Sequence, residues 1–253
     1  MTRHYRATAA QKAIGIAIAT LAMALLAFVL HAEDIAAATG SKGTLQVDIT
    51  SPADRSRLPW QAQGNYSVTV SYDGRSTRYG DIPSNQVLVT ATYLPDIAKA
   101  PPAGGADPDS GLVAITQSNC TGCHDFAAKA VGPSFAAIGQ RHAAASSVAT
   151  LADHIRNGSG GSWGTTRMPP HPDLDQAEAT EMAQWIVAHA NDPGVRNHVG
   201  NEGSFRMEAP TAPGSRAGMM LTATYTGTLK PGDTRRPAGG RSRIIIEAVS
   251  AAP

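Results

Sequence analysis

Three stretches in the first part of the chain alternate apolar with polar residues, at 45–49, 66–72 and 87–93. Alternation puts the apolar side chains on one face of an extended chain, so each stretch predicts a half-buried β-strand. Pro95 ends the third strand, because proline cannot donate to a sheet ladder. Residues 43–100 are therefore predicted to form a β-rich segment that has too few strands to be stable alone.

Between residues 107 and 192 the apolar positions take the spacing of helices instead. Three helices are predicted, at 111–119, at 148–157 and from 175 to a point before Pro193. The last of these begins at Asp175, and Glu178 three residues later completes a capping box. The glycine- and proline-rich stretch 101–105 predicts a linker that separates this helical segment from the strands before it.

Alternation returns in the last part of the chain, after a second linker that is predicted at residues 191–203. Strands are predicted at 219–225 and 244–248, with a shorter one at 204–208. Residues 204–253 therefore form a second β-rich segment, which again has too few strands to fold alone.

The first 38 residues have the pattern of an export leader. Arg3, Arg6 and Lys12 give it a positive start, and residues 13–30 are an uncharged apolar run. Small residues near 30–38 offer cleavage sites, which favours a signal peptide. The run is also about long enough to span a bilayer, so an uncleaved membrane anchor remains the alternative. Both interpretations place the rest of the chain in the periplasm or elsewhere outside the cytoplasmic membrane.

The charge of the chain gives no basis for binding nucleic acid. Its 21 Lys and Arg residues face 20 Asp and Glu residues, so the formal net charge is only +1. Aromatic residues make up 5% of the chain, which is little for a protein that builds its cores from side chains alone. A large apolar cofactor would supply part of the missing volume.

The only two cysteines lie in the sequence Cys120-Thr121-Gly122-Cys123-His124. This C-x-x-C-H spacing is typical of covalent haem attachment. Two thiols three positions apart on one turn reach the two vinyl groups of one porphyrin, and His124 then binds the iron. A disulfide or a thioredoxin-like dithiol is the alternative, but the latter needs a preceding strand and a βαβ pattern, which are not predicted here.

The stretch from about 107 to 192 resembles a short bacterial class I cytochrome c. The features that carry the resemblance occur in the family's order: a first helix, the Cys120–His124 motif, Gly132-Pro133, Arg167-Met168-Pro169, and a last helix with Trp185. The resemblance implies one covalently attached haem c, with His124 and Met168 as axial ligands. It also implies that Pro133 steadies His124 and that the first and last helices cross. Two tryptophans are candidates to touch the porphyrin: Trp185 on the last helix, which we expect to contact the haem, and Trp163, which either flanks the haem edge or fills the glycine-rich loop.

The sixth ligand has two candidates, Met168 and His171. A thioether stabilises ferrous iron and raises the reduction potential, whereas a second imidazole lowers it. Met168 lies in a glycine-rich loop that is able to fold over the haem face. We therefore expect Met168 to be the ligand and keep His171 as the alternative. His142, His154 and His189 show no ligand spacing and are expected at the surface or in helix packing.

Crossing end helices bring the two ends of a domain close together, and such a domain is easily inserted into a host. We therefore expect an α+β multidomain chain in which an all-α class I cytochrome c domain (107–192) is inserted between, or flanked by, the two β-rich segments. Together these segments would form one immunoglobulin-like sandwich.

The function that these features indicate is single-electron transfer by cycling Fe(III) and Fe(II). With both axial positions filled the domain is expected to be a carrier rather than an enzyme, either by itself or as a subunit of an oxidoreductase complex. Its partner would be a dehydrogenase, an oxidase or another cytochrome, with docking through the β-rich module and membrane association through residues 13–30 if these stay uncleaved. The alternatives are a small-ligand sensor or peroxidase with a dissociable sixth ligand, and a β-sandwich binding protein with an ancillary haem.

Overall fold

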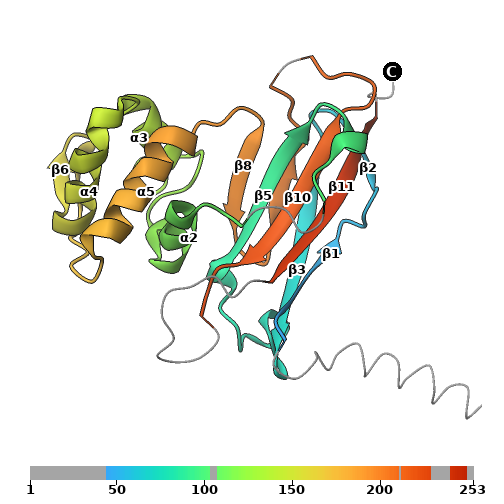
Figure 1. The fold of residues 1–253 in the computed structure, drawn as a ribbon, viewed down its shortest axis with the longest axis horizontal. Helices are drawn as coiled ribbons and strands as arrows, with labels where there is room; N and C mark the ends of the chain where they lie inside the picture. The colour runs from blue at the N-terminus through green and yellow to red at the C-terminus, as the bar shows by residue number, and fades with distance from the viewer. Residues whose placement is uncertain (1–43, 103–106, 211, 229–239, 250–253) are drawn as a thin grey trace, which may run out of the picture.

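The computed structural model of the protein describes residues 44–102, 107–210, 212–228 and 240–249 (Figure 1). The predicted leader at residues 1–38 lies outside these ranges. Within them, none of the helices combines the length and the apolar character needed to cross a membrane.

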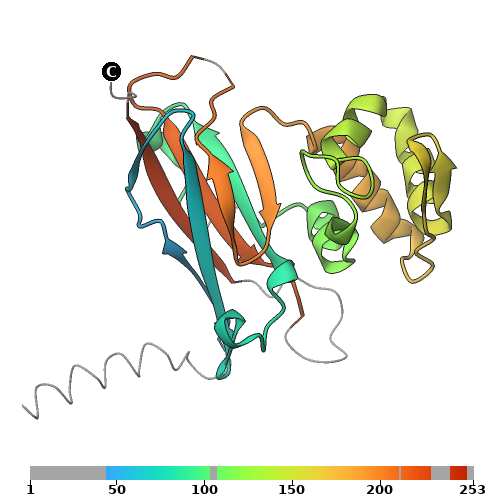
Figure 2. The same ribbon diagram turned by 180° about the vertical axis from the view of Figure 1, so that it is seen from behind.

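Strands from both ends of the chain build two facing sheets, which we call the β unit (Figures 1 and 2). In the first sheet β3 is central and pairs with three strands; its members are β1 (Gln46–Ser51), β3 (Gln63–Tyr72), β4 (Arg75–Ser76) and β9 (Glu202–Arg206). The second sheet has the order β2 (Arg57–Pro59), β11 (Arg241–Val249), β10 (Gly218–Tyr225), β5 (Val87–Leu94) and β8 (Val195–Val199).

The pairing joins strands that precede the helical segment to strands that follow it. Ala91 of β5 lies opposite Leu221 of β10, and Tyr66 of β3 lies opposite Gly203 of β9, both in antiparallel register. Alternate residues of both sheets enter one apolar cluster, which includes Val70 and Leu221, each 0% exposed. The five longer strands predicted from alternation are thus confirmed, and they share one core across the two flanks.

The helices and the short hairpin between residues 107 and 192 lie together beside the second sheet, and we call them the helical unit (Figure 1). Its elements are α2 (Ser110–Gln117), α3 (Phe135–Arg141), α4 (Val148–Asn157), the hairpin β6 (Ser159–Gly161) and β7 (Gly164–Met168), and α5 (Gln176–His189). The predicted capping box is present, because Asp175 accepts from the Glu178 amide and Glu178 accepts from the Asp175 amide.

The first and last helices cross at Gly111. A Cβ atom there would lie 2.2 Å from the Glu181 carbonyl oxygen and 2.9 Å from the Cβ of Trp185. Only hydrogen fits between the two backbones, so this glycine permits α2 and α5 to pack directly. The crossing that the resemblance implied is confirmed.

Two expectations from the sequence are wrong. The linker predicted at 191–203 contains β8, an edge strand whose polar residues Arg196, Asn197 and His198 hide its alternation. The glycine-rich stretch predicted as a loop contains the β6–β7 hairpin. Gly158, Gly161 and Gly164 all have positive φ angles, which let the chain reverse there.

Candidate functional site

A pocket of about 390 Å³ lies inside the helical unit, between α3, α4, α5 and the β6–β7 hairpin. Six residues singled out from the sequence line it together: Cys120, Cys123, His124, Pro133, Met168 and His171. They come from positions up to 51 residues apart (120 to 171), so the fold gathers them. The surrounding lining is largely apolar and includes Ile115, Phe135 and Ile155.

The two cysteines reach the pocket through a tight turn. Asn119 adopts a left-handed backbone (φ 57°), which ends α2 and starts a 3-10 turn over Cys120–Gly122. The amides of Cys123 and His124 both donate to the Cys120 carbonyl, at 3.1 Å and 3.0 Å. The turn therefore presents both thiols and the imidazole to the same cavity.

The His124 ring is buried and is held in place by the backbone of Gly132 and Pro133. Its Nδ1 lies 2.7 Å from the Pro133 carbonyl oxygen, which can only accept a hydrogen bond. Nδ1 therefore carries the proton and leaves the Nε2 lone pair of the neutral ring available for a metal. Gly132 also lies against the ring, so close that a Cβ there would be 2.5 Å from the ring carbon Cε1 and 2.8 Å from Nδ1.

Met168 and His171 lie on a strap tied to the end of α4. Gly158, with φ 77°, passes so close that a Cβ there would lie 2.7 Å from the Met168 carbonyl oxygen. The His171 amide donates to the Arg156 carbonyl at 3.0 Å. Both candidate sixth ligands are thus fixed at the pocket wall, Met168 as the last residue of β7.

Trp185, which was expected to contact the cofactor, is not part of the pocket lining. It packs edge-on against Phe126 and Phe135, with interplanar angles of 85° and 83°. The α5 face toward the pocket carries Met182 and Ile186 instead. Trp185 lies to one side of that face and supports Phe135, whose ring is 5.5 Å from that of His124.

Trp163 lines the pocket and makes a contact that the sequence did not indicate. Arg141 lies over the exposed Trp163 ring, 4.8 Å from its centre, and donates to the Ser162 carbonyl. His142 and His154 also line the pocket. No spacing rule pairs residues 22 positions apart (141 and 163) on different elements, so no signal was available. Among the described residues that line this pocket there is no carboxylate.

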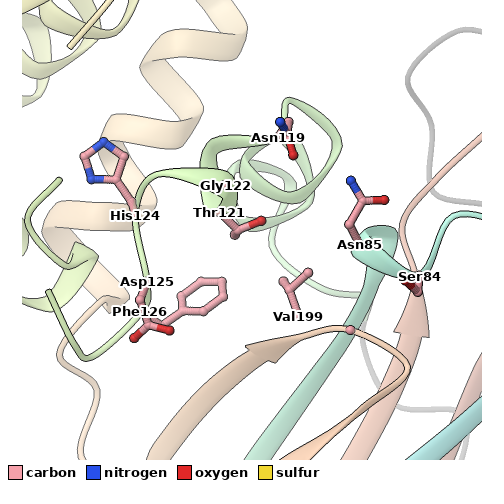
Figure 3. Close-up of a pocket in the computed structure, with 10 residues that line it drawn as sticks. Ser84, Asn85, Asn119, Thr121, Gly122, His124, Asp125, Phe126 and Val199 are labelled. Atoms are coloured by element: carbon pink, nitrogen blue, oxygen red, sulfur yellow. The ribbon is translucent and has the colours of Figure 1, made fainter. Parts of the chain in front are cut away.

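A second hollow of about 330 Å³ lies behind the cysteine turn, between segment 119–126 and the β unit (Figure 3). Asn119 and Phe126 line it from the helical unit, and Asn85 and Val199 line it from the β unit. Figure 3 shows the His124 imidazole pointing away from Val199. Segment 119–126 is therefore a wall with the first pocket on one side and this crevice on the other.

Comparison with known proteins identifies relatives of the helical unit. A family model described as cytochrome C oxidase, cbb3-type, subunit III matches residues 107–186. Cytochrome c-551 of Azotobacter vinelandii is 42% identical over 82 residues, which cover 32% of this chain and 99% of that protein. Cytochrome c-552 of Hydrogenobacter thermophilus is 41% identical over 87 residues, covering 31% of this chain and 88% of that protein.

Among solved structures, that of Nitrosomonas europaea cytochrome c552 aligns with 37% identity and a TM-score of 0.29, over 30% of this chain and 94% of that chain. This chain thus spans nearly the whole of each of these relatives, whereas each of them covers about a third of it.

Proposed function

Over residues 107–186 this chain belongs to the cytochrome c family, and on that premise we propose that it carries single electrons between redox partners on one covalently attached haem c. The observation that supports this most directly is the convergence of two thiols, an imidazole and a thioether on one largely apolar pocket. Thiols suit attachment to a porphyrin, and imidazole and thioether are the axial ligands of electron-carrying cytochromes c.

Cys120 and Cys123 would hold the haem by thioether bonds, and His124 and Met168 would bind the iron. When bound, the haem supplies the Fe(III)/Fe(II) couple. Pro133 keeps the proton on Nδ1 of His124, which orients the ring and directs Nε2 toward the metal. If His124 and Met168 both bind the iron, no coordination site would be left for a substrate, and the protein would act as a carrier. The apolar lining limits water around the couple.

The arrangement of domains is the second part of the proposal. The two sheets form one immunoglobulin-like sandwich, contributed by 43–100 and 204–253, and the cytochrome domain 107–192 is inserted between its halves. Pairing of β5 with β10 and of β3 with β9 across the insertion supports this. The β unit docks the carrier to its redox partner, which is a dehydrogenase, an oxidase or another cytochrome.

The protein works outside the cytoplasmic membrane, in the periplasm, where haem c is attached. The leader pattern of residues 1–38 supports export, with either cleavage or retention of residues 13–30 as an anchor.

The function is tested on the exported full-length protein by haem staining of a denaturing gel and by a redox titration. We expect a stained band at the mass of the chain and a reversible one-electron couple. A Cys120→Ser, Cys123→Ser variant should lose the stain. A colourless wild-type band would refute the proposal.

The axial pair is tested with two variants. Met168→Leu should abolish the methionine–iron charge-transfer band of the ferric form and lower the potential, whereas His171→Asn should leave both unchanged. If the wild-type protein lacked this band, and only His171→Asn changed its spectrum and potential, His171 would be the ligand. If the wild-type band disappears on adding cyanide or peroxide in small excess, the sensor or peroxidase function applies instead.

A further inference from the structure

The β unit and the helical unit are joined by a buried apolar contact, which is separate from the core between the two sheets. Leu88 of β5 is 2% exposed, yet it belongs to the apolar cluster of the helical unit and not to the cluster between the sheets. Its neighbours in the strand, Val87 and Val89, face the other way, into the β-unit core. Val199, the last residue of β8, also packs against the helical cluster.

A polar contact lies beside this apolar one. Thr226 is 0% exposed; its hydroxyl donates to the Gln86 carbonyl at 2.9 Å and lies 2.8 Å from the hydroxyl of Thr116 in α2, which is 1% exposed. The side-chain amide of Gln117 donates to the Thr226 carbonyl. Buried polar groups are costly when unpaired, so these bonds fix the last turn of α2 on the β unit. We call Leu88, Val199 and Thr226 the seam.

The seam lies next to the wall that carries the cysteines. α2 ends at Gln117, and the chain passes directly into Asn119 and the turn at Cys120. Asn119 and His124 line both the pocket and the crevice behind it. Figure 3 shows Phe126 and Val199 on the two sides of that crevice. The Phe126 ring is 5.4 Å from Phe135, which in turn lies beside His124.

We propose that the seam is a positioning element of the electron-transfer site, in which the β unit sets the reduction potential of the haem. This inference rests on the proposed function. The seam residues act through segment 119–126 and do not line the haem pocket. By holding segment 119–126 in place, the β unit keeps the crevice behind it separate from the pocket. Ferric haem has one more positive charge than ferrous haem, and water stabilises it. A segment that loosened and let crevice water into the pocket would therefore lower the potential.

Two matched variants of the full-length, haem-loaded protein test the proposal. Leu88→Ala removes a seam side chain, and Leu221→Ala makes the same change in the neighbouring part of the same sheet but in the cluster between the sheets. Both should lower the midpoint of thermal unfolding. Only Leu88→Ala should lower the reduction potential, and Leu88→Met, which conserves volume, should restore it.

A second pair of variants, at Thr226, tests the proposal independently if a leucine variant fails to fold. Thr226→Val keeps the shape and loses the hydroxyl, so it should lower the potential, and Thr226→Ser should return it toward wild type. Equal potentials in all folded variants, or equal shifts for Leu221→Ala and Leu88→Ala, would overturn the inference. Both outcomes require a reversible haem couple, so they are distinct from failure of the proposed function, which would show as the absence of that couple.

Discussion

At the scale of single residues, Gly132 determines how closely the chain approaches the His124 ring. The ring has the Pro133 carbonyl on its Nδ1 side and the Gly132 backbone beside Cε1. The position has no positive φ that would by itself call for glycine. The requirement is therefore space, and it concerns the residue proposed to bind the iron.

Gly132→Ala is expected to displace the imidazole, because the new Cβ would lie 2.5 Å from Cε1. Overpacking of this kind costs about 1–3 kcal/mol. We expect less haem-stained protein and a lower free energy of unfolding in denaturant. Gly214→Ala is the control, because nothing lies within 4 Å of a Cβ there. A stable Gly132→Ala protein with a wild-type spectrum would contradict this account of the site.

Single residues of the site were predictable where the signal is local. Cys120, Cys123 and His124 are neighbours in sequence, and one turn brings them to the pocket. Met168 is 44 residues away from His124 and reaches the pocket through the strap on α4, so the resemblance was needed to single it out. His171 was then considered because it lies three residues after Met168 and is itself a possible iron ligand. Trp185 is buried as expected but does not line the pocket, because helical spacing identifies a buried face and does not say which buried residue meets a cavity.

At the scale of elements, β8 carries a histidine in an unusual setting. The Nε2 atom of His198 is buried and has no hydrogen-bond partner within the described structure. Burial lowers the pKa of His198 below its usual 6.5, and Arg196 lowers it further, while Asp125 raises it. The ring faces Tyr66 at 6.0 Å, and burial raises the pKa of that tyrosine to about 12, so it stays neutral at physiological pH.

The lowered pKa of His198 predicts a loss of stability in mild acid. Below its usual pKa the unfolded chain binds a proton at this ring that the folded chain does not bind, so the free energy of unfolding falls as pH drops through about 6.5. His198→Gln removes this contribution. Unfolding in denaturant at about pH 7.5 and about pH 5.5 should show a smaller difference for the variant than for wild type. An equal difference would mean that His198 titrates normally.

Helices and strands were predictable where the sequence has capping residues at their ends or a clear hydrophobic period along their length. The capping box fixed the start of α5, and Asn157 marked the end of α4. α3 was not predicted as a helix, because its seven residues are too few for a period to show. β8 was missed because an edge strand needs only one apolar face and tolerates polar residues on the other.

At the scale of the whole molecule, the insertion is supported by strand pairing between residues far apart in sequence. β11 joins the sheet beside both β10 and β2, and Arg243 donates to the Pro101 carbonyl of the linker that leads to the helical unit. The sequence indicated this arrangement only indirectly, since neither set of strands was sufficient alone. The seam was not predictable: Leu88 lies on the face of its strand that alternation leaves toward solvent, and the sequence does not say that the helical unit covers that face.

The shared sandwich predicts that the β unit survives a cut in the chain. A protease site placed between residues 101 and 107 should yield two fragments that remain associated on native gel filtration and separate in denaturant, because β5 stays paired with β10. A protease site in the loop between β4 and β5 is a control within one flank. If residues 44–100 stay folded after removal of 204–249, the two flanks do not depend on each other and the proposal is wrong.

The pairing of β5 with β10 also has a consequence for biogenesis. A chain that emerges with its N-terminus first exposes the edge of β5 until residues 218–225 have followed, more than a hundred positions later (94 to 218). Until then the nascent protein presents unsatisfied backbone groups next to an apolar face, a combination that invites aggregation. The same delay leaves Thr116 of α2 without its hydrogen-bond partner Thr226 until that residue has followed.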